Sequence, residues 1–169
     1  MQDENQLFEI IKGAFDAFLG RHSVLLDVNA NERSMTHKLA EALQEVFPNM
    51  DVDCEYNRHG RSTKKIVACW GDGIQPDDLD AKTVYPDIVV HTRGNDENNV
   101  LVIEVKKSNA RRCSACDAEK LKAFTGDEFR YRVGLYVEID AERGSVSKVE
   151  CYKDGNKVKG TIWDRLGSQ

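Results

Sequence analysis

Two short apolar runs, each interrupted by charges, stand out in the pattern of hydrophobic and polar positions along the chain. Residues 85–93 read YPDIVVHTR and residues 100–107 read VLVIEVKK. β-Branched and aliphatic residues in runs of this length predict buried strands. A buried strand normally excludes charge, because ionised groups lose hydration there unless they are paired or bound to a metal. The charges inside these strands therefore suggest a functional site.

The alternation of strand side chains places these charges on one face. Glu104 and Lys106 point to the same side of their strand, while Asp87 opens the other strand on the same face as His91. If the two strands pair, an aspartate, a glutamate and a lysine converge. We expect this point to hold a divalent cation and an activated water. His91 lies near enough to reach such a site, but we favour a hydrogen-bonded structural histidine.

The remaining pattern predicts helices before and after these strands. Residues 6–19 carry a helical stripe that ends at Gly20, and residues 31–47 carry a second one, with Asn29 and Glu32 at capping-box spacing. The other expected elements are strands at 51–56, 65–70 and 132–139, a helix at 116–124, and a terminal hairpin of 146–152 and 157–163 that turns at Asp154-Gly155. This order predicts an α/β fold with a mixed sheet.

Length, composition and charge narrow the class of protein. The chain has 169 residues, and we expect residues 1–169 to form a single domain. Neither a membrane-length apolar run nor a signal peptide is evident, so we expect a cytoplasmic protein. The formal charge of −5 argues against indiscriminate nucleic-acid binding, although local positive patches matter more than the sum.

The cysteines do not suggest a disulfide framework, because their number is odd and the expected compartment is reducing. Cys113 and Cys116 form a lone CxxC, whereas a zinc site needs four ligands. We expect this pair to open the helix at 116–124. A cysteine-based zinc or redox protein remains as an alternative class of function.

The charged set in the two strands matches the needs of phosphodiester hydrolysis. That reaction requires charge stabilisation at the phosphoryl oxygens and a deprotonated water, and Mg²⁺ can supply both. Mg²⁺ prefers oxygen ligands and keeps several waters, so two or three carboxylates suffice. A neighbouring lysine can orient the water or offset phosphate charge. Asp87, Glu104, the Val105 carbonyl and Lys106 provide this set.

These residues resemble the PD-(D/E)XK nuclease superfamily, which has the restriction-endonuclease-like fold. The motif reads Pro86-Asp87, then sixteen residues, then Glu104-Val105-Lys106. The segments DCEYNR and PDIVVH are also similar to a group of small bacterial proteins assigned to this superfamily. The resemblance covers roughly residues 31–139. It implies an αβββαβ core, here with an extra N-terminal helix and a C-terminal hairpin.

The resemblance implies a metal-dependent nuclease, and we expect DNA as its substrate. In such an enzyme Asp87, Glu104 and the Val105 carbonyl would bind Mg²⁺ or Mn²⁺, and Lys106 would position the attacking water. Glu32, on the helix before the sheet, would hold a second metal or a water on the first. The alternative is a catalytically inactive module of the same fold that binds nucleic acid or a protein partner. Specific cleavage would need a homodimer or a partner protein.

Two basic clusters are candidate phosphate contacts, one in the turn before the strand at 65–70 and one after the strand at 100–107. If both lie on one rim, they form a positive groove, whereas the alternative is an ordinary solvated turn. A lysine on the helix at 116–124 is a secondary candidate. The expected nucleic-acid-binding set is Arg58, Arg61, Lys64, Lys65, Lys107, Arg111, Arg112 and Lys120.

Overall fold

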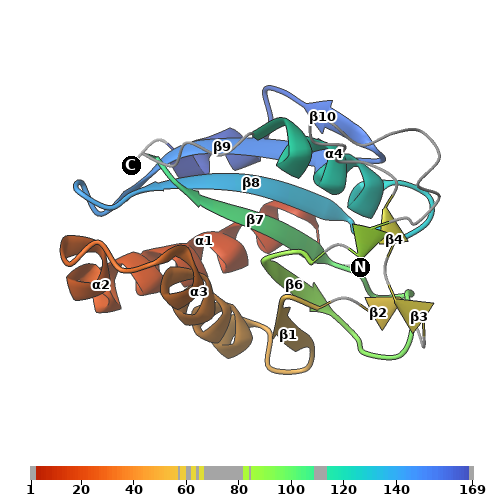
Figure 1. The fold of residues 1–169 in the computed structure, drawn as a ribbon, viewed down its shortest axis with the longest axis horizontal. Coiled ribbons are helices and arrows are strands. Elements are labelled where there is room, and N and C mark those ends of the chain that lie inside the picture. Colours follow the sequence, from red (N-terminus) through yellow and green to blue (C-terminus); the bar gives the residue numbers. More distant parts are fainter. Residues whose placement is uncertain are drawn as a thin grey trace.

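The computed structural model describes residues 3–56, 85–108 and 114–167, and only the backbone of four two-residue strands between residues 58 and 83 and of residues 114 and 115. Its centre is a six-stranded sheet in the order β1-β6-β7-β8-β9-β10, with helices on both faces (Figure 1). β7 and β8 run parallel, and the other neighbouring strands are antiparallel. The predicted α/β class with a mixed sheet is confirmed.

The main helices and strands follow the chain in the order that the sequence pattern predicts, and several short elements are added. Of the strand predicted at 65–70, the structure describes Lys65–Ile66, which lies outside the main sheet. The helices are α1 (Glu4–Arg21), α2 (Ser23–Asp27), α3 (Glu32–Val46), α4 (Ser114–Thr125) and the 3₁₀ helix η1 (Ile162–Gly167). The strands of the main sheet are β1 (Asp51–Cys54), β6 (Ile88–His91), β7 (Leu101–Lys107), β8 (Val133–Asp140), β9 (Ser145–Lys153) and β10 (Asn156–Val158). Two small antiparallel pairs stand apart, β2 (Arg58–His59) with β3 (Ser62–Thr63) and β4 (Lys65–Ile66) with β5 (Lys82–Thr83).

The strand alternation divides the core into two layers. Ile103 and Val105 of β7 pack with α1 and α3 on one face of the sheet. Val102 of the same strand packs on the other face, with Leu121 and Phe124 of α4. Because side chains alternate along β7, Glu104 and Lys106 must face α4 as well. The predicted separation of charged and apolar faces is therefore confirmed.

The boundaries of two helices differ from the predicted ones. α1 continues through Gly20 to Arg21, and the short α2 follows directly. The N-cap of α3 is Asn31, whose side chain accepts a hydrogen bond from the Ser34 amide at 2.8 Å. Asn29 has a φ of 52° instead, so it turns the chain between α2 and α3. A cap two residues nearer the helix satisfies the free amides of its first turn directly.

The C-terminal hairpin is shorter than predicted. Asp154 and Gly155 form its turn with φ values of 48° and 72°, as expected for this dipeptide between antiparallel strands. The second arm ends at Val158, and η1 then packs Trp163 into the core instead of extending the strand. Within the described part of the chain, helices are too short or too polar to cross a membrane.

Candidate active site

The site begins where β6 and β7 stop pairing. Their register ends at Ile88 opposite Ile103, and Asp87, which follows Pro86, is the residue just before β6. There the Asp87 side chain accepts the Val105 amide through Oδ2 at 2.7 Å. Proline has no amide to donate, which favours the end of the ladder at this point. The strand end thus fixes the Asp87 carboxylate beside β7.

Glu104 is the most deeply buried charge of the site. Its side chain is 0 % exposed, and Oε2 accepts a hydrogen bond from Lys120 at 3.2 Å. The other oxygen, Oε1, is buried without a hydrogen-bond partner among the described residues. Burial and the neighbouring negative charge of Asp87 raise the pKa of Glu104 to about 8, against the opposing effect of Lys120. A buried carboxylate oxygen without a hydrogen-bond partner can still coordinate a cation.

Lys106 lies between two carboxylates without a hydrogen bond to either. Its Nζ is 3.9 Å from Asp87 Oδ2 and 3.7 Å from Asp117 Oδ2, and its side chain is only 12 % exposed. Both separations are too long for a hydrogen bond but short enough for strong attraction. The ammonium is therefore held in place electrostatically, with its N–H groups available to a ligand.

Asp117 and Lys120 of α4 complete the site, and the sequence interpretation did not place Asp117 there. Lys120 donates to Asp117 Oδ1 at 3.3 Å as well as to Glu104. Burial would lower the pKa of Lys120, but the charges of Glu104 and Asp117 outweigh it and raise that pKa. The sequence contained a signal for this, because Asp117 and Lys120 share the helical face of Leu121 and Phe124. Charges on a face that packs against the sheet need partners there.

Asp87 carries two opposing influences on its protonation. Burial raises its pKa, whereas the Val105 amide and the charges of Lys106 and Lys120 oppose that rise. The net direction is upward. Asp87 and Glu104 thus both hold their negative charge less readily than exposed carboxylates, as expected for two acids that share a buried site.

The site opens into a pocket of about 400 Å³ between α3 and the diverging strand ends, where Asp87 and Lys106 meet Glu32. Glu32, the first residue of α3, accepts the Lys107 amide through Oε1 at 3.3 Å. Asp87 and Lys106 of the predicted triad therefore meet the helix glutamate at one pocket, whereas the fully buried Glu104 does not line it. Cys54 also lines it, and burial, with nearby carboxylates, raises its pKa to about 11, so it remains a thiol at neutral pH.

His91 is a structural residue, as we favoured. Its Nε2 lies 3.0 Å from Asp53 Oδ2, and its ring packs edge-on against Tyr56 with 4.4 Å between centroids. Burial would raise the pKa of Asp53, but hydrogen bonds from Arg93 and His91 outweigh it and lower that pKa. These contacts lie away from the pocket and anchor β1 to β6.

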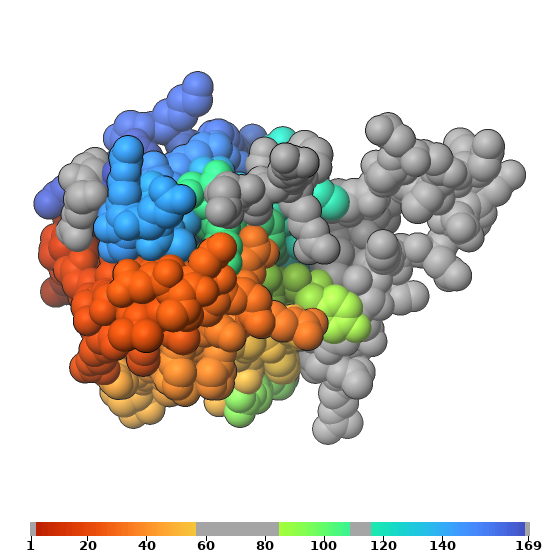
Figure 2. Space-filling view, turned by 60° about the vertical axis from the view of Figure 1, so that its left-hand side comes forward, coloured from red at the N-terminus to blue at the C-terminus, as the bar shows by residue number. Residues whose placement is uncertain are grey.

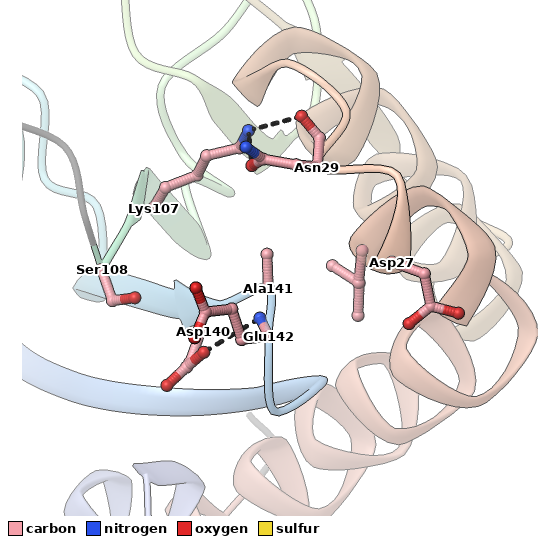
Figure 3. A pocket seen from close by; sticks show the side chains of 8 residues that line it. Asp27, Asn29, Lys107, Ser108, Asp140, Ala141 and Glu142 are labelled. Carbon is pink, nitrogen blue, oxygen red and sulfur yellow. Dashed lines mark hydrogen bonds between the residues drawn. The ribbon is translucent and has the colours of Figure 1, made fainter.

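A larger pocket of about 570 Å³ lies elsewhere, between the α2–α3 connection and the ends of β7 and β8. In Figure 2 these two regions, coloured orange and light blue, lie side by side. Figure 3 shows that Lys107 crosses this pocket to Asn29, whose carbonyl and Oδ1 accept at 3.0 and 2.7 Å. Asp140 accepts a hydrogen bond from the Glu142 amide through Oδ1 at 3.0 Å. Because these groups are already paired, we assign the chemistry to the smaller pocket.

The expected nucleic-acid-binding residues are dispersed where the structure describes them. Lys107 reaches Asn29 at the α2–α3 connection, and Lys120 of α4 is engaged by Glu104 and Asp117. The structure gives only the backbone of Arg58 and Lys65, in β2 and β4. The other four residues lie outside the described part of the chain: Arg61, Lys64, Arg111 and Arg112.

The cysteines differ from expectation at one position. Cys116 is disulfide-bonded, and its partner lies outside the described residues. Cys54 and Cys151 are free thiols. An odd number of cysteines argues against a complete framework but does not exclude a single bond, which is why the expectation failed here. The disulfide leaves Cys116 without a thiolate for a zinc site.

The carboxylates of Asp87 and Glu104 suit a hard cation only if water molecules complete its coordination shell. Within the described residues, no cluster of three or more His, Cys, Asp or Glu side chains is arranged to hold a metal ion. Two carboxylates with a free, buried Glu104 Oε1 do fit Mg²⁺ or Mn²⁺, which keep waters in their coordination shell. Searches of family models, curated proteins and solved structures find no match to this chain.

Proposed function

We propose that this chain is a metal-dependent phosphodiesterase of the PD-(D/E)XK type that cleaves DNA. One observation carries the proposal. Asp87, Glu104 and Lys106 come together at the diverging ends of β6 and β7, and two of them face a pocket that Glu32 also lines. Charged groups that lose their hydration by being buried together are typical of functional sites.

The order of elements also supports the proposal. With the short strands β2 to β5 left aside, the element order matches the αβββαβ core that the resemblance implies: α3, β1, β6, β7, α4 and β8. β7 and β8 pair in parallel, with α4 as the crossover between them. This crossover brings Asp117 and Lys120 over the same face as Glu104.

The residues divide the work of phosphodiester hydrolysis among them. Asp87 and Glu104, with the Val105 carbonyl, would hold Mg²⁺ or Mn²⁺, which would supply Lewis-acid stabilisation of the phosphoryl oxygens. Lys106 would donate to a phosphoryl oxygen or orient the attacking water from its place beside Asp87. Glu32 would accept a hydrogen bond from that water at the α3 wall of the pocket.

The test compares two adjacent lysines of β7. Lys106→Met removes the ammonium beside Asp87, whereas Lys107→Met removes the ammonium that lies on Asn29 across the sheet. We expect Lys106→Met to reduce cleavage by about 10²- to 10³-fold, the usual cost of losing one transition-state donor. Lys107→Met should lose far less activity than Lys106→Met, because its ammonium contacts Asn29 and not Asp87. Plasmid, linear duplex, single-stranded DNA and RNA would each be assayed with Mg²⁺, Mn²⁺ or EDTA.

Equal activity of the two variants, or cleavage that persists in EDTA, would contradict the proposed mechanism. Preferential cleavage of RNA would retain the chemistry and change the substrate. Cleavage without sequence preference by the isolated chain would leave specificity to a homodimer or a partner protein.

An inactive binding module is the second candidate, and the ion pairs of Lys120 favour it. Lys120 neutralises Glu104 and Asp117 from within the fold, as a structural network would. Calorimetric titration with Mn²⁺ separates the two candidates. A catalytic site should bind Mn²⁺ and lose it in Asp87→Asn, whereas a binding module should show no heat of Mn²⁺ binding in either protein.

A further inference from the structure

Five charged side chains form an open chain of alternating sign at the face covered by α4. Lys120 joins Glu104 to Asp117 at 3.2 and 3.3 Å, and Lys106 joins Asp117 to Asp87 at 3.7 and 3.9 Å. Asp117, with its side chain 8 % exposed, is the central member. Each of its two oxygens faces a different lysine.

The two ends of this chain are the two proposed cation ligands. Asp87 precedes β6 and Glu104 lies on β7, both just beyond the last paired position. Among the described residues, no single lysine pairs with both carboxylates, and we call the position between them the gap. Glu104 Oε1 is buried with no partner among the described residues. Three acids and two lysines carry a formal charge of −1, so one divalent cation leaves the site positive toward a phosphate.

A lysine could fill the same gap. The four-carbon stem of lysine is flexible, and its ammonium is a compact charge that seeks the nearest carboxylate. Lys106 is less than 4 Å from Asp87, and Lys120 already contacts Glu104. On the α4 side, both ammonium groups share Asp117 as a partner.

We propose that Asp117 is a positioning residue that keeps Lys106 and Lys120 out of the gap between Asp87 and Glu104, so that a divalent cation can occupy it. The inference rests on the proposed function, because it takes Asp87 and Glu104 as the cation ligands. It adds a role for α4 in metal binding without making Asp117 itself a ligand.

The experiment measures Mn²⁺ affinity by calorimetry, which needs no cleavage activity. Asp117→Asn should weaken Mn²⁺ binding by about 10- to 100-fold, the usual effect of losing an outer partner of a metal site. Asp117→Glu keeps the charge but moves the carboxylate by one methylene, so it should weaken binding too. The double variant Asp117→Asn/Lys120→Met removes a competing ammonium and should recover most of the affinity.

The same helix offers a matched control. Glu119 and Lys122 form an exposed pair with the spacing of Asp117 and Lys120, and their nitrogen and oxygen are 2.6 Å apart. Glu119→Gln removes one negative charge from α4 and should leave Mn²⁺ affinity unchanged. Circular dichroism would establish that each variant is folded; if Asp117→Asn is not, Asp117→Glu and the double variant carry the test.

Unchanged affinity in Asp117→Asn, or wild-type affinity in Asp117→Glu, would overturn the positioning role, because charge alone would then suffice. Failure of the double variant to recover would overturn it in favour of Asp117 as a ligand. Wild-type protein that binds no Mn²⁺ would overturn both this inference and the proposed function. Wild-type protein that binds Mn²⁺ without cleaving would overturn the proposed function alone.

Discussion

At the scale of single residues, the site is built from charges that water would otherwise solvate. Glu104 is fully buried on β7, and among the described residues only Lys120 pairs with it, through one of its two oxygens. Replacing a whole buried ion pair by apolar residues often costs little stability, so a gain in stability does not explain why these charges are buried. The position of Glu104 was predictable from the alternation of β7, but its partner Lys120 was expected to contact phosphate instead.

Glu104 should make the metal-free protein less stable at alkaline pH. Its pKa is raised to about 8, above the ordinary value of 4.5, because burial disfavours the ionised form. The stability that the folded protein has with Glu104 protonated is fully present below the pKa of Glu104 in the unfolded chain. It is lost as the pH rises through the pKa of Glu104 in the folded protein. Glu104→Gln cannot ionise, so its free energy of unfolding should exceed that of wild type by about 5 kcal/mol at pH 9 and match it near pH 4.

Thermal denaturation in EDTA at the two pH values measures this difference, for which a shift in Tm of about 10–20 °C is expected at pH 9. Glu119→Gln, an exposed change on α4, serves as the control. A variant that follows the wild-type pH profile would show that Glu104 does not titrate as described.

At the scale of elements, the site depends on how closely α4 approaches the sheet. Gly134 of β8 lies under α4, where a Cβ would come within 2.9 Å of Thr125 Cγ2 and 3.3 Å of Tyr152 Cβ. Only glycine lets the helix lie this near, and α4 carries Asp117 and Lys120 over Glu104. Periodicity predicted the helix and its apolar face, but it could not predict this distance.

Gly134→Ala should therefore destabilise the protein by about 1–3 kcal/mol through overpacking. Gly13→Ala in α1, where nothing lies within 4 Å of the added Cβ, should instead stabilise it by about 0.5–1 kcal/mol. Urea denaturation of both variants measures the two free energies of unfolding. Equal stability of the two variants would mean that α4 can shift at no cost.

At the scale of the whole molecule, the two ends of the described chain meet on the α1 face of the sheet. Trp163 of η1 is fully buried and packs edge-on against Phe8, and its indole N–H donates to Glu4 Oε1 at 3.0 Å. Lys153 of β9 also pairs with Glu4. The pattern predicted a strand through Trp163, whereas the tertiary structure uses this residue to close the core.

Trp163→Ala should destabilise the protein by about 3–5 kcal/mol, the usual cost of removing a buried aromatic ring. The exposed Tyr85 provides the comparison, because Tyr85→Ala should change stability little. Chemical denaturation would measure both. A small effect of Trp163→Ala would show that η1 is dispensable to the core.

The sequence by itself determined the α/β class, the two buried strands and the face on which Asp87, Glu104 and Lys106 lie. These follow from local periodicity, because side-chain direction along a strand depends only on position. The tertiary structure alone decided that Asp117 joins the two lysines, that Lys107 turns to Asn29, and where β6 and β7 part. Such contacts join residues far apart in the chain, and no local pattern specifies which distant partner a buried charge will meet.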